Sequence, residues 1–220
     1  MIQEKGRQLM NKRNDIRSTR SKYFIRKAMV ELLEHHTLEE ISVADISEKA
    51  EVSRRTFYIY YESKKDCLLF ILDELMDEMF GDQVFHYDPD SRHGVKDAWL
   101  VNLQTLIQVI HDNRVLIQAM FRDLSVEEWM PLIQVPYDDQ MEDFWDQLKE
   151  NENIPDSILQ LCKTIDCMQM AMYMNFIAAS NITPEHGLDN IVQMLQIQKK
   201  RRLEWETALF GSTVSLPSYM

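Results

Sequence analysis

Apolar positions in the first third of the chain recur every three or four residues, the spacing of the buried face of an α-helix. Ser42 precedes one such run and has Asp45 three residues after it, which is an imperfect capping box for a short helix. The pattern predicts four helices: from Thr19 to about residue 34, from Ser42 to about Ala50, over Arg54–Tyr60, and from about Lys64 to Met79, with Gly81 ending the last.

The rest of the chain is predicted to be helical as well. Residues 82–94 (DQVFHYDPDSRHG) are turn-like and form the best candidate boundary between a small head and a larger body. Residues 1–18 have no sustained apolar face and are expected to form a flexible basic arm, and residues 211–220 a flexible tail. Further helices are predicted over 95–112, 113–123, 125–131, 137–150, 155–180 and 185–209, with breaks at Pro131, Pro136, Pro155 and Pro184.

Charge is divided unevenly between these two parts. The chain has a net charge of −12, but residues 1–65 hold 14 Lys/Arg and 10 Asp/Glu (14 − 10 = +4), which leaves 24 − 14 = 10 and 36 − 10 = 26 for residues 66–220 (10 − 26 = −16). A polyanion such as DNA would be attracted to the head and repelled by the body, and part of the basic arm is available to touch it. An ordinary solvated surface is the alternative interpretation.

Other features narrow the class of protein. Three cysteines without paired spacing predict no disulfide framework and fit a reducing cytoplasm. No signal peptide or membrane-spanning run is recognisable, so no membrane partner is expected. His86 and His93 could bind a metal, but a solvated loop is the preferred interpretation because no third ligand is positioned. No nucleophile, phosphate loop or metal signature is found, so neither catalysis nor a cofactor is expected.

Two short helices joined by a tight turn have the size of a DNA-reading helix-turn-helix unit. Arginine side chains can bond guanine edges, Thr and Ile can contact thymine methyl groups, and Tyr or Ser hydroxyls can bond phosphates. Phe57 and Tyr61 are predicted to pack inward. The residues predicted to contact DNA are Ser42, Ser53, Arg54, Arg55, Thr56, Tyr58, Ile59, Tyr60, Lys64 and Lys65.

The stretch from Ile41 to Leu69, ISVADISEKAEVSRRTFYIYYESKKDCLL, closely resembles the N-terminal domain of the TetR/AcrR family. The resemblance extends over roughly residues 19–76. It implies an all-α protein with an N-terminal three-helix helix-turn-helix DNA-binding domain (19–65) and a C-terminal helical domain (66–210) that binds an effector and forms a dimer. By the same resemblance Thr56, Tyr58 and Tyr60 contact DNA with the two arginines, and Lys64 clamps the DNA backbone.

Two positions depart from the family pattern. Glu51 stands where the family usually places a glycine in the turn, and a left-handed backbone there would cost Glu roughly 1 kcal/mol relative to Gly. Tyr61 replaces the commoner phenylalanine and adds a hydroxyl that needs a partner if it is buried.

The body carries two apolar stripes that suit a two-fold interface, although they could instead close the body's own core. Fourteen methionines, many of them beside aromatic residues, also suit an adaptable pocket for an apolar or cationic effector, with ordinary core filling as the alternative. The pocket candidates are Trp99, Phe121, Met168, Met172 and Phe176. The stripes comprise Ile158, Leu161, Cys162, Ile165, Met168, Met172 and Phe176, and Leu188, Ile191, Val192, Leu195, Leu203 and Leu209.

The sequence therefore predicts a cytoplasmic homodimeric transcriptional regulator that binds a palindromic double-stranded DNA operator. Repression relieved by a small-molecule effector is the expected mode, and an activator built from the same parts is an open alternative. A helical protein-interaction module that keeps the fold without binding an operator is the rival from another class.

Overall fold

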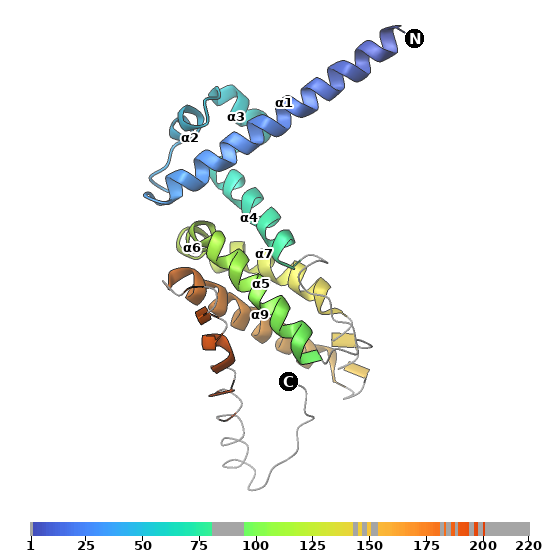
Figure 1. Ribbon diagram of the computed structural model, residues 1–220, viewed down its shortest axis with the longest axis vertical. Helices are drawn as coiled ribbons and strands as arrows, with labels where there is room; N and C mark the ends of the chain where they lie inside the picture. Colours follow the sequence, from blue (N-terminus) through green and yellow to red (C-terminus); the bar gives the residue numbers. More distant parts are fainter. Residues whose placement is uncertain are drawn as a thin grey trace.

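The computed structural model describes residues 2–80, 95–142, 145–146, 149–150, 154–180, 183, 186–187, 189–193, 196–197 and 200, with the backbone alone described for 2–17 and 95–103. This part of the chain is built from α-helices, and it divides into a head at one end and a helical body at the other (Figure 1). The helices are α1 (Ile2–Leu33), α2 (Val43–Lys49), α3 (Arg54–Tyr60), α4 (Lys64–Phe80), α5 (Val95–Asp112), α6 (Arg114–Asp123), α7 (Val126–Gln140) and α9 (Asp156–Ala179).

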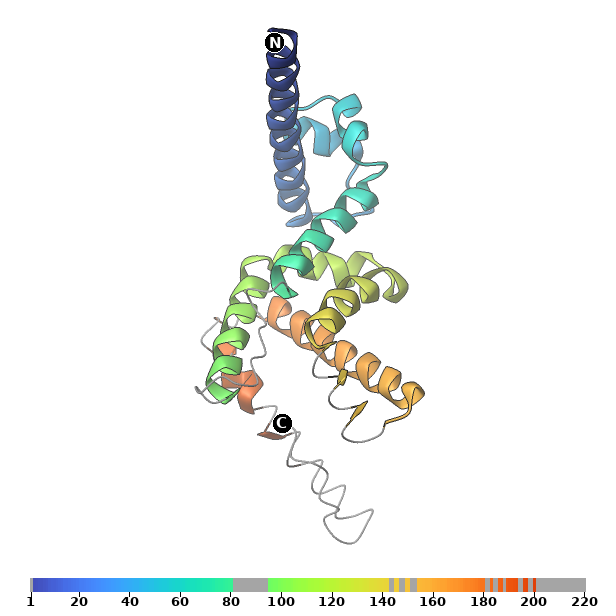
Figure 2. The same ribbon diagram turned by 90° about the vertical axis from the view of Figure 1, so that its right-hand side faces the viewer.

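The head consists of α1, α2 and α3 packed around a small apolar core. Ile25 and Met29 of α1 meet Ile46 of α2 and Phe57 of α3, and all four side chains are fully buried. The four helices predicted for residues 19–80 are therefore confirmed in kind and in order. Figure 2 shows α4 leading from the head into the body.

The first helix is longer than the sequence pattern indicated. Residues 2–18 were expected to form a flexible arm, but α1 begins at Ile2 and runs without a break to Leu33. The segment contains no proline and a single glycine, so nothing in its covalent structure interrupts a helix that the head anchors at its other end. Figure 1 shows this half of α1 projecting away from the rest of the molecule.

The body places α9 against α5, α6 and α7. Separate helices were predicted on either side of Pro131 and Pro136, but α7 continues through both prolines. Trp129, Ile133 and Tyr137 explain why, because they lie one turn apart and form a single buried stripe that spans the two breaks. Burial of that stripe offsets the backbone hydrogen bonds that the prolines cannot donate.

Some predicted features lie outside the described residues: the boundary segment 82–94 with His86 and His93, the tail 211–220, and most of the helix predicted over 185–209. Within the described part, no helix is both long and apolar enough to cross a membrane. Among the same residues, no group of three or more His, Cys, Asp or Glu side chains is placed to hold a metal ion.

Candidate nucleic-acid interface

Both helices of the helix-turn-helix unit begin at a serine cap. The Ser42 hydroxyl accepts the amide of Asp45 (3.2 Å) and donates to the Asp45 carboxylate (2.6 Å), which also accepts the Ser42 amide (2.8 Å). These hydrogen bonds from Ser42 hold the pKa of Asp45 below its ordinary value, because they favour the charged carboxylate. The capping box is complete, so the Ser42 hydroxyl, predicted to bind DNA, already spends its proton on Asp45.

Ser53 caps α3 in the same way. Its hydroxyl oxygen accepts the amide of Thr56 (3.0 Å), and the two hydroxyl groups share a hydrogen bond of 2.8 Å. The cap fixes where α3 starts and therefore which residues face outward. Thr56 is half-buried at this end of the helix, whereas Arg54 and Arg55 in the first turn are exposed.

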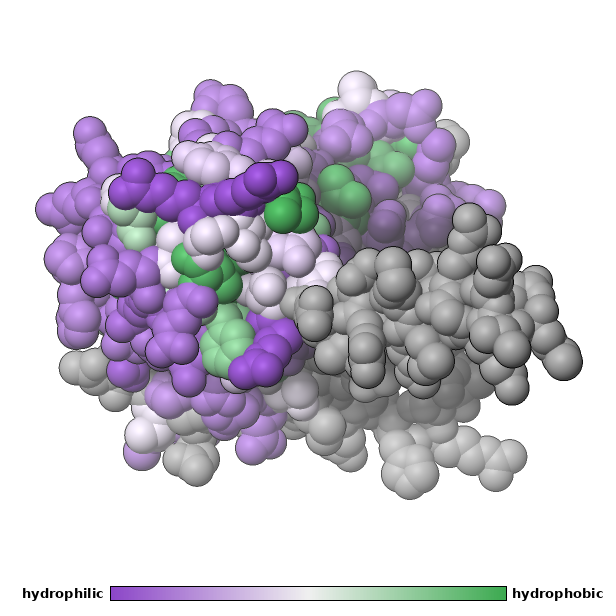
Figure 3. All heavy atoms as spheres, turned by 90° about the horizontal axis from the view of Figure 1, so that it is seen from above, coloured by the Kyte–Doolittle hydropathy of each residue, from purple (hydrophilic) through white to green (hydrophobic). Residues whose placement is uncertain are grey.

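The outward face of α3 agrees with the sequence prediction. Tyr58 and Ile59 are exposed, Ile59 to 66 %, on the side opposite the fully buried Phe57. Two arginines, a tyrosine and an isoleucine therefore stand on one short helix, which supplies both hydrogen-bond donors and an apolar contact for the edges of bases. Seen from the head end, the described surface is mostly hydrophilic with scattered apolar patches (Figure 3).

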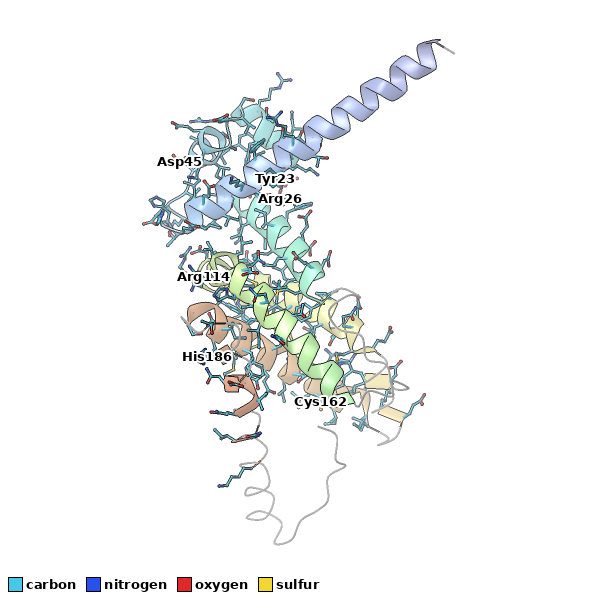
Figure 4. All side chains as sticks on the ribbon, in the orientation of Figure 1. Tyr23, Arg26, Asp45, Arg114, Cys162 and His186 are labelled. Atoms are coloured by element: carbon cyan, nitrogen blue, oxygen red, sulfur yellow. The ribbon has the colours of Figure 1, made fainter. Side chains whose placement is uncertain are left out.

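Tyr60 is held by a residue that the sequence analysis did not select. The Lys22 ammonium of α1 lies 5.7 Å from the centre of the Tyr60 ring and 5.5 Å from the centre of the Phe70 ring. Arg26, one turn along α1, stacks on the other member of this pair, 5.1 Å from the Phe70 ring centre. These cation–π contacts tie α1 to both α3 and α4 and orient Tyr60. Figure 4 shows Arg26 and Tyr23 on this part of α1.

The turn between α2 and α3 has the backbone that the sequence predicted. Glu51 has a φ of 54°, and within the described part of the chain it is the one residue other than glycine with a positive φ. The neighbouring Val52 amide donates to the carbonyl of Ser47 (2.9 Å), which closes the end of α2. A left-handed residue is needed here, and a glutamate supplies it at a cost.

The two lysines that open α4 are used differently from the prediction. Lys64 was expected to clamp the DNA backbone, but its ammonium donates to the carbonyls of Glu39 (2.8 Å) and Ile41 (2.7 Å), in the loop before α2. Lys65 forms an ion pair with Glu128 at the start of α7. Both side chains brace the protein itself, and their partners lie too far away along the chain for spacing to reveal them.

Tyr61 is buried, as predicted, with 2 % of its surface exposed. Its hydroxyl makes no well-formed hydrogen bond with any group that the structure describes. Burial raises the pKa of Tyr61, and the nearby Arg26 guanidinium opposes that shift. The question raised by this departure from the family pattern is therefore real in the structure, since a polar group sits in the core without a proper partner.

Polar contacts join the head to the turn between α6 and α7. The Asp123 carboxylate, whose side chain is 7 % exposed, accepts the amide of Leu38 (3.0 Å) and pairs with Arg122 (2.8 Å). Arg122 also donates to the carbonyl of His36 (3.1 Å). Together with the ion pair of Lys65, these contacts fix the body to the loop after α1 and to the start of α4.

The predicted pocket residues are not gathered around a cavity. Phe121 is half-buried and packs edge-on against Trp129, with ring centres 5.1 Å apart. Met168, Met172 and Phe176 lie on the outer face of α9, Met172 with 68 % of its surface exposed, so the prediction that they line an internal pocket is wrong for the single chain. Their large apolar side chains face outward because the inner face of α9 packs through other residues. The side chain of Trp99 lies outside the described part.

Comparison with known proteins places the head in a family. Residues 25–70 match the model described as "Bacterial regulatory proteins, tetR family". The dhaKLM operon transcriptional activator DhaS of Lactococcus lactis is 27% identical over 97 residues, 44% of this chain and 46% of that protein. The regulator YvdT of Bacillus subtilis is 26% identical over 146 residues, 61% of this chain and 70% of that protein. The regulator EthR of Mycobacterium tuberculosis is 45% identical over 47 residues, 21% of this chain and 22% of that protein.

The fold extends the likeness beyond the head. The structure of a dihydroxyacetone kinase operon activator, also named DhaS, superposes with a TM-score of 0.55 at 18% identity, covering 82% of this chain and 96% of that one. The sequence alignment spans less than half of the first curated relative, so the body resembles it in architecture more than in residues. The helix-turn-helix unit is the part for which sequence and structure agree.

Proposed function

Because the chain belongs to the tetR family of bacterial regulatory proteins, we propose that it binds a specific palindromic DNA operator and regulates transcription there. The observation that carries this proposal is the outward face of α3, where Arg54, Arg55, Tyr58 and Ile59 are exposed on a helix capped at Ser53. The basic head and acidic body support it, because they orient the molecule with this face toward the phosphates. Arg54 and Arg55 read guanine edges, while Ile59 contacts a thymine methyl group.

A selection from a random duplex library with purified protein tests the proposal, followed by titration of the recovered duplex at two salt concentrations. A palindromic site, bound by two chains with affinity that falls steeply as salt rises, is the expected result. Arg55→Lys is the informative variant, because it keeps the charge but loses the bidentate guanidinium. It should lose preference for the selected sequence and keep the salt dependence. Recovery of no sequence would favour the protein-interaction module instead.

The outer face of α9 supports a homodimer. Its exposed side chains follow one another every three or four residues along the whole helix, so they form one continuous apolar stripe. The interpretation that this stripe closes the body's own core is wrong, because the inner face of α9 does so through Leu159, Cys167, Ala171, Met174, Ile177 and Ala178. The outer stripe consists of Ile158, Leu161, Ile165, Met168, Met172 and Phe176.

We infer that this stripe meets its copy on a second chain, which sets the two recognition helices about 34–36 Å apart or somewhat more, one turn of DNA. Ile165→Asp would place a charge in the middle of the stripe. It should convert the dimer to a monomer in light scattering and abolish operator binding. Val135→Asp is the matched control, since Val135 is an equally exposed apolar residue on α7, outside the stripe. A monomeric native protein would refute the inference.

Coupling of the body to the head supports regulation by an effector. The Asp123 carboxylate and Arg122 guanidinium hold the backbone of Leu38 and His36, so a shift of α6 would move the loop from which α2 begins. We propose that an apolar or cationic effector acts through this junction to change the spacing of the two heads. Quenching of tryptophan fluorescence by neutral or cationic apolar compounds, and not by anionic ones, is the expected result.

Repression is the proposed sign of regulation, and the likeness to an operon activator supports the opposite sign as the second candidate. A reporter gene behind the selected operator separates them. Expression of the protein should lower transcription if it represses, and raise transcription if it activates.

A further inference from the structure

Half of α1 extends beyond the packed head. The first buried residue of α1 is Ile25, and the first residue that contacts another helix through a described ring contact is Lys22. The helix nevertheless begins at Ile2. At about 1.5 Å per residue, positions 2–18 form roughly 25 Å of helix outside the core. Figures 1 and 2 show this segment leaving the head on the side away from the body.

The projecting segment is strongly basic. Residues 2–20 contain six Lys/Arg and two Asp/Glu, so their net charge is 6 − 2 = +4, whereas residues 66–220 carry −16. Most of the positive charge of the head is therefore placed on a helix that the fold of the head does not require. A structural role in the core does not explain these positions.

The basic positions share one side of the helix. Arg13, Arg17 and Arg20 succeed one another at spacings of four and three residues, which keeps them in one line along α1. Asp15 falls two residues from Arg17 and so lies on the opposite side, and Glu4, eleven residues before Asp15, shares that side. The segment thus presents a basic face and an acidic back.

The basic line runs into a groove beside the turn of the helix-turn-helix unit. Arg20 and Lys27 of α1 line this groove together with Lys49 of α2, and its volume is about 410 Å³. Glu31 pairs with Lys49 (2.9 Å) in the same groove, so charges there are largely compensated. The unpaired excess of positive charge lies on the part of the line before residue 20, pointing to a partner beyond the head.

We propose that residues 2–18 of α1 form a second DNA-contact element, which lies along the phosphate backbone of duplex DNA flanking each half-site. This inference rests on the proposed operator binding, because α3 must dock first to bring the segment to the duplex. About 25 Å of helix matches about 7 base pairs of flanking DNA at 3.4 Å per pair. The contacts involve phosphates, so they add affinity and salt dependence without adding sequence preference.

The test uses the full-length protein, two lengths of the selected duplex, and the arm variant K12Q/R13Q/R17Q. One duplex extends about 10 base pairs beyond each half-site and the other stops at the half-sites, a choice set by the reach of the segment. Native protein should bind the long duplex at least tenfold more tightly than the short one. In the arm variant this difference should disappear, and the slope of log affinity against log salt on the long duplex should fall by about 2 to 3, or roughly 0.9 per lost phosphate contact.

Two controls make the result specific. R114Q/K149Q/K163Q also removes three positive charges, but from the body, and should leave the difference between the two duplexes unchanged. E4Q/D15N removes the acidic back of the segment and should tighten binding to the long duplex only. Circular dichroism of each variant confirms that helix content is retained.

The outcomes separate this inference from the proposed function. Sequence-selective binding that ignores duplex length and the arm variant would overturn the inference and leave the function intact. If no sequence is recovered, the proposed function fails, and the arm is judged on a random duplex, where an unchanged salt slope in K12Q/R13Q/R17Q would overturn it. Binding of native protein to vesicles of phosphatidylserine, lost in the arm variant while DNA binding is unchanged, would assign the segment to a membrane surface instead.

Discussion

Replacing Glu51 by glycine should make this protein more stable, although the change removes every side-chain atom beyond Cα. Glu51 has a φ of 54° at the turn between α2 and α3. An L-residue pays about 1–2 kcal/mol for this left-handed conformation, because its Cβ crowds the following carbonyl oxygen. Glycine avoids that cost but loses about 0.5–1 kcal/mol through the greater freedom of its unfolded chain. The expected gain for Glu51→Gly is therefore about 1 kcal/mol.

Glu51→Gln is the matched control, because it removes the charge and keeps the strained backbone. Its free energy of unfolding should stay close to that of the native protein, and Glu51→Ala should likewise show no gain. All four tryptophans lie beyond residue 98, in the body, so unfolding of the head is better followed by far-ultraviolet circular dichroism in a urea titration than by fluorescence.

A glycine variant no more stable than the glutamine variant would refute the reasoning. It would mean that the turn of the native protein relaxes to a negative φ at Glu51, and that the likeness to the glycine-containing turn of the family ends one residue earlier. A gain shared equally by both variants would instead assign the effect to the lost charge.

Three further predictions follow from single side chains. Tyr61→Phe should stabilise the protein by about 1 kcal/mol in chemical denaturation, because it removes a buried hydroxyl that lacks a well-formed hydrogen bond; a loss of stability would show that this hydroxyl has a strong partner. Cys162, which is half-exposed, should react with a thiol reagent in the native state, whereas Cys67, fully buried with its pKa raised to about 12 by burial, should react only after unfolding; mass spectrometry of the labelled protein decides. The pKa of Asp45 is lowered by its hydrogen bonds from Ser42, so its contribution to stability is complete above the pKa of the unfolded chain and is lost as pH falls through the lower folded value; Asp45→Asn should flatten this acid limb of the unfolding curve, and an unaltered limb would contradict the prediction.

The head was predictable because its determinants are local. Ser42 and Asp45 are three residues apart, and so are Ser53 and Thr56, so both caps could be anticipated from spacing. The positive φ of Glu51 followed from a single departure from the family pattern. Each of these features is fixed by neighbours within one helical turn.

The roles of the lysines at the start of α4 could not be read in this way. Lys64 reaches carbonyls of the loop before α2, and Lys65 reaches Glu128 in the body. A basic pair at the start of a helix beside a recognition helix has the composition of a phosphate clamp, and sequence spacing carries no sign of a distant acceptor. Polar contacts between elements far apart in the chain depend on how those elements pack, which is settled by apolar burial before any of the charges meet.

The outer stripe of α9 shows the same limit from the opposite side. The sequence identified its members correctly, because their spacing is local, but it also assigned Met168, Met172 and Phe176 to an internal pocket. An apolar stripe at helical spacing states that a surface will be covered, and leaves open whether the cover is the same chain, a ligand or a second copy. In α9 the inner face includes the small residues Cys167 and Ala171, which let the neighbouring helices approach closely, so the bulkier stripe turns outward. A continuous row of large apolar side chains along a helix of 24 residues is the size of a subunit interface, and a second copy of this chain presents the complementary surface.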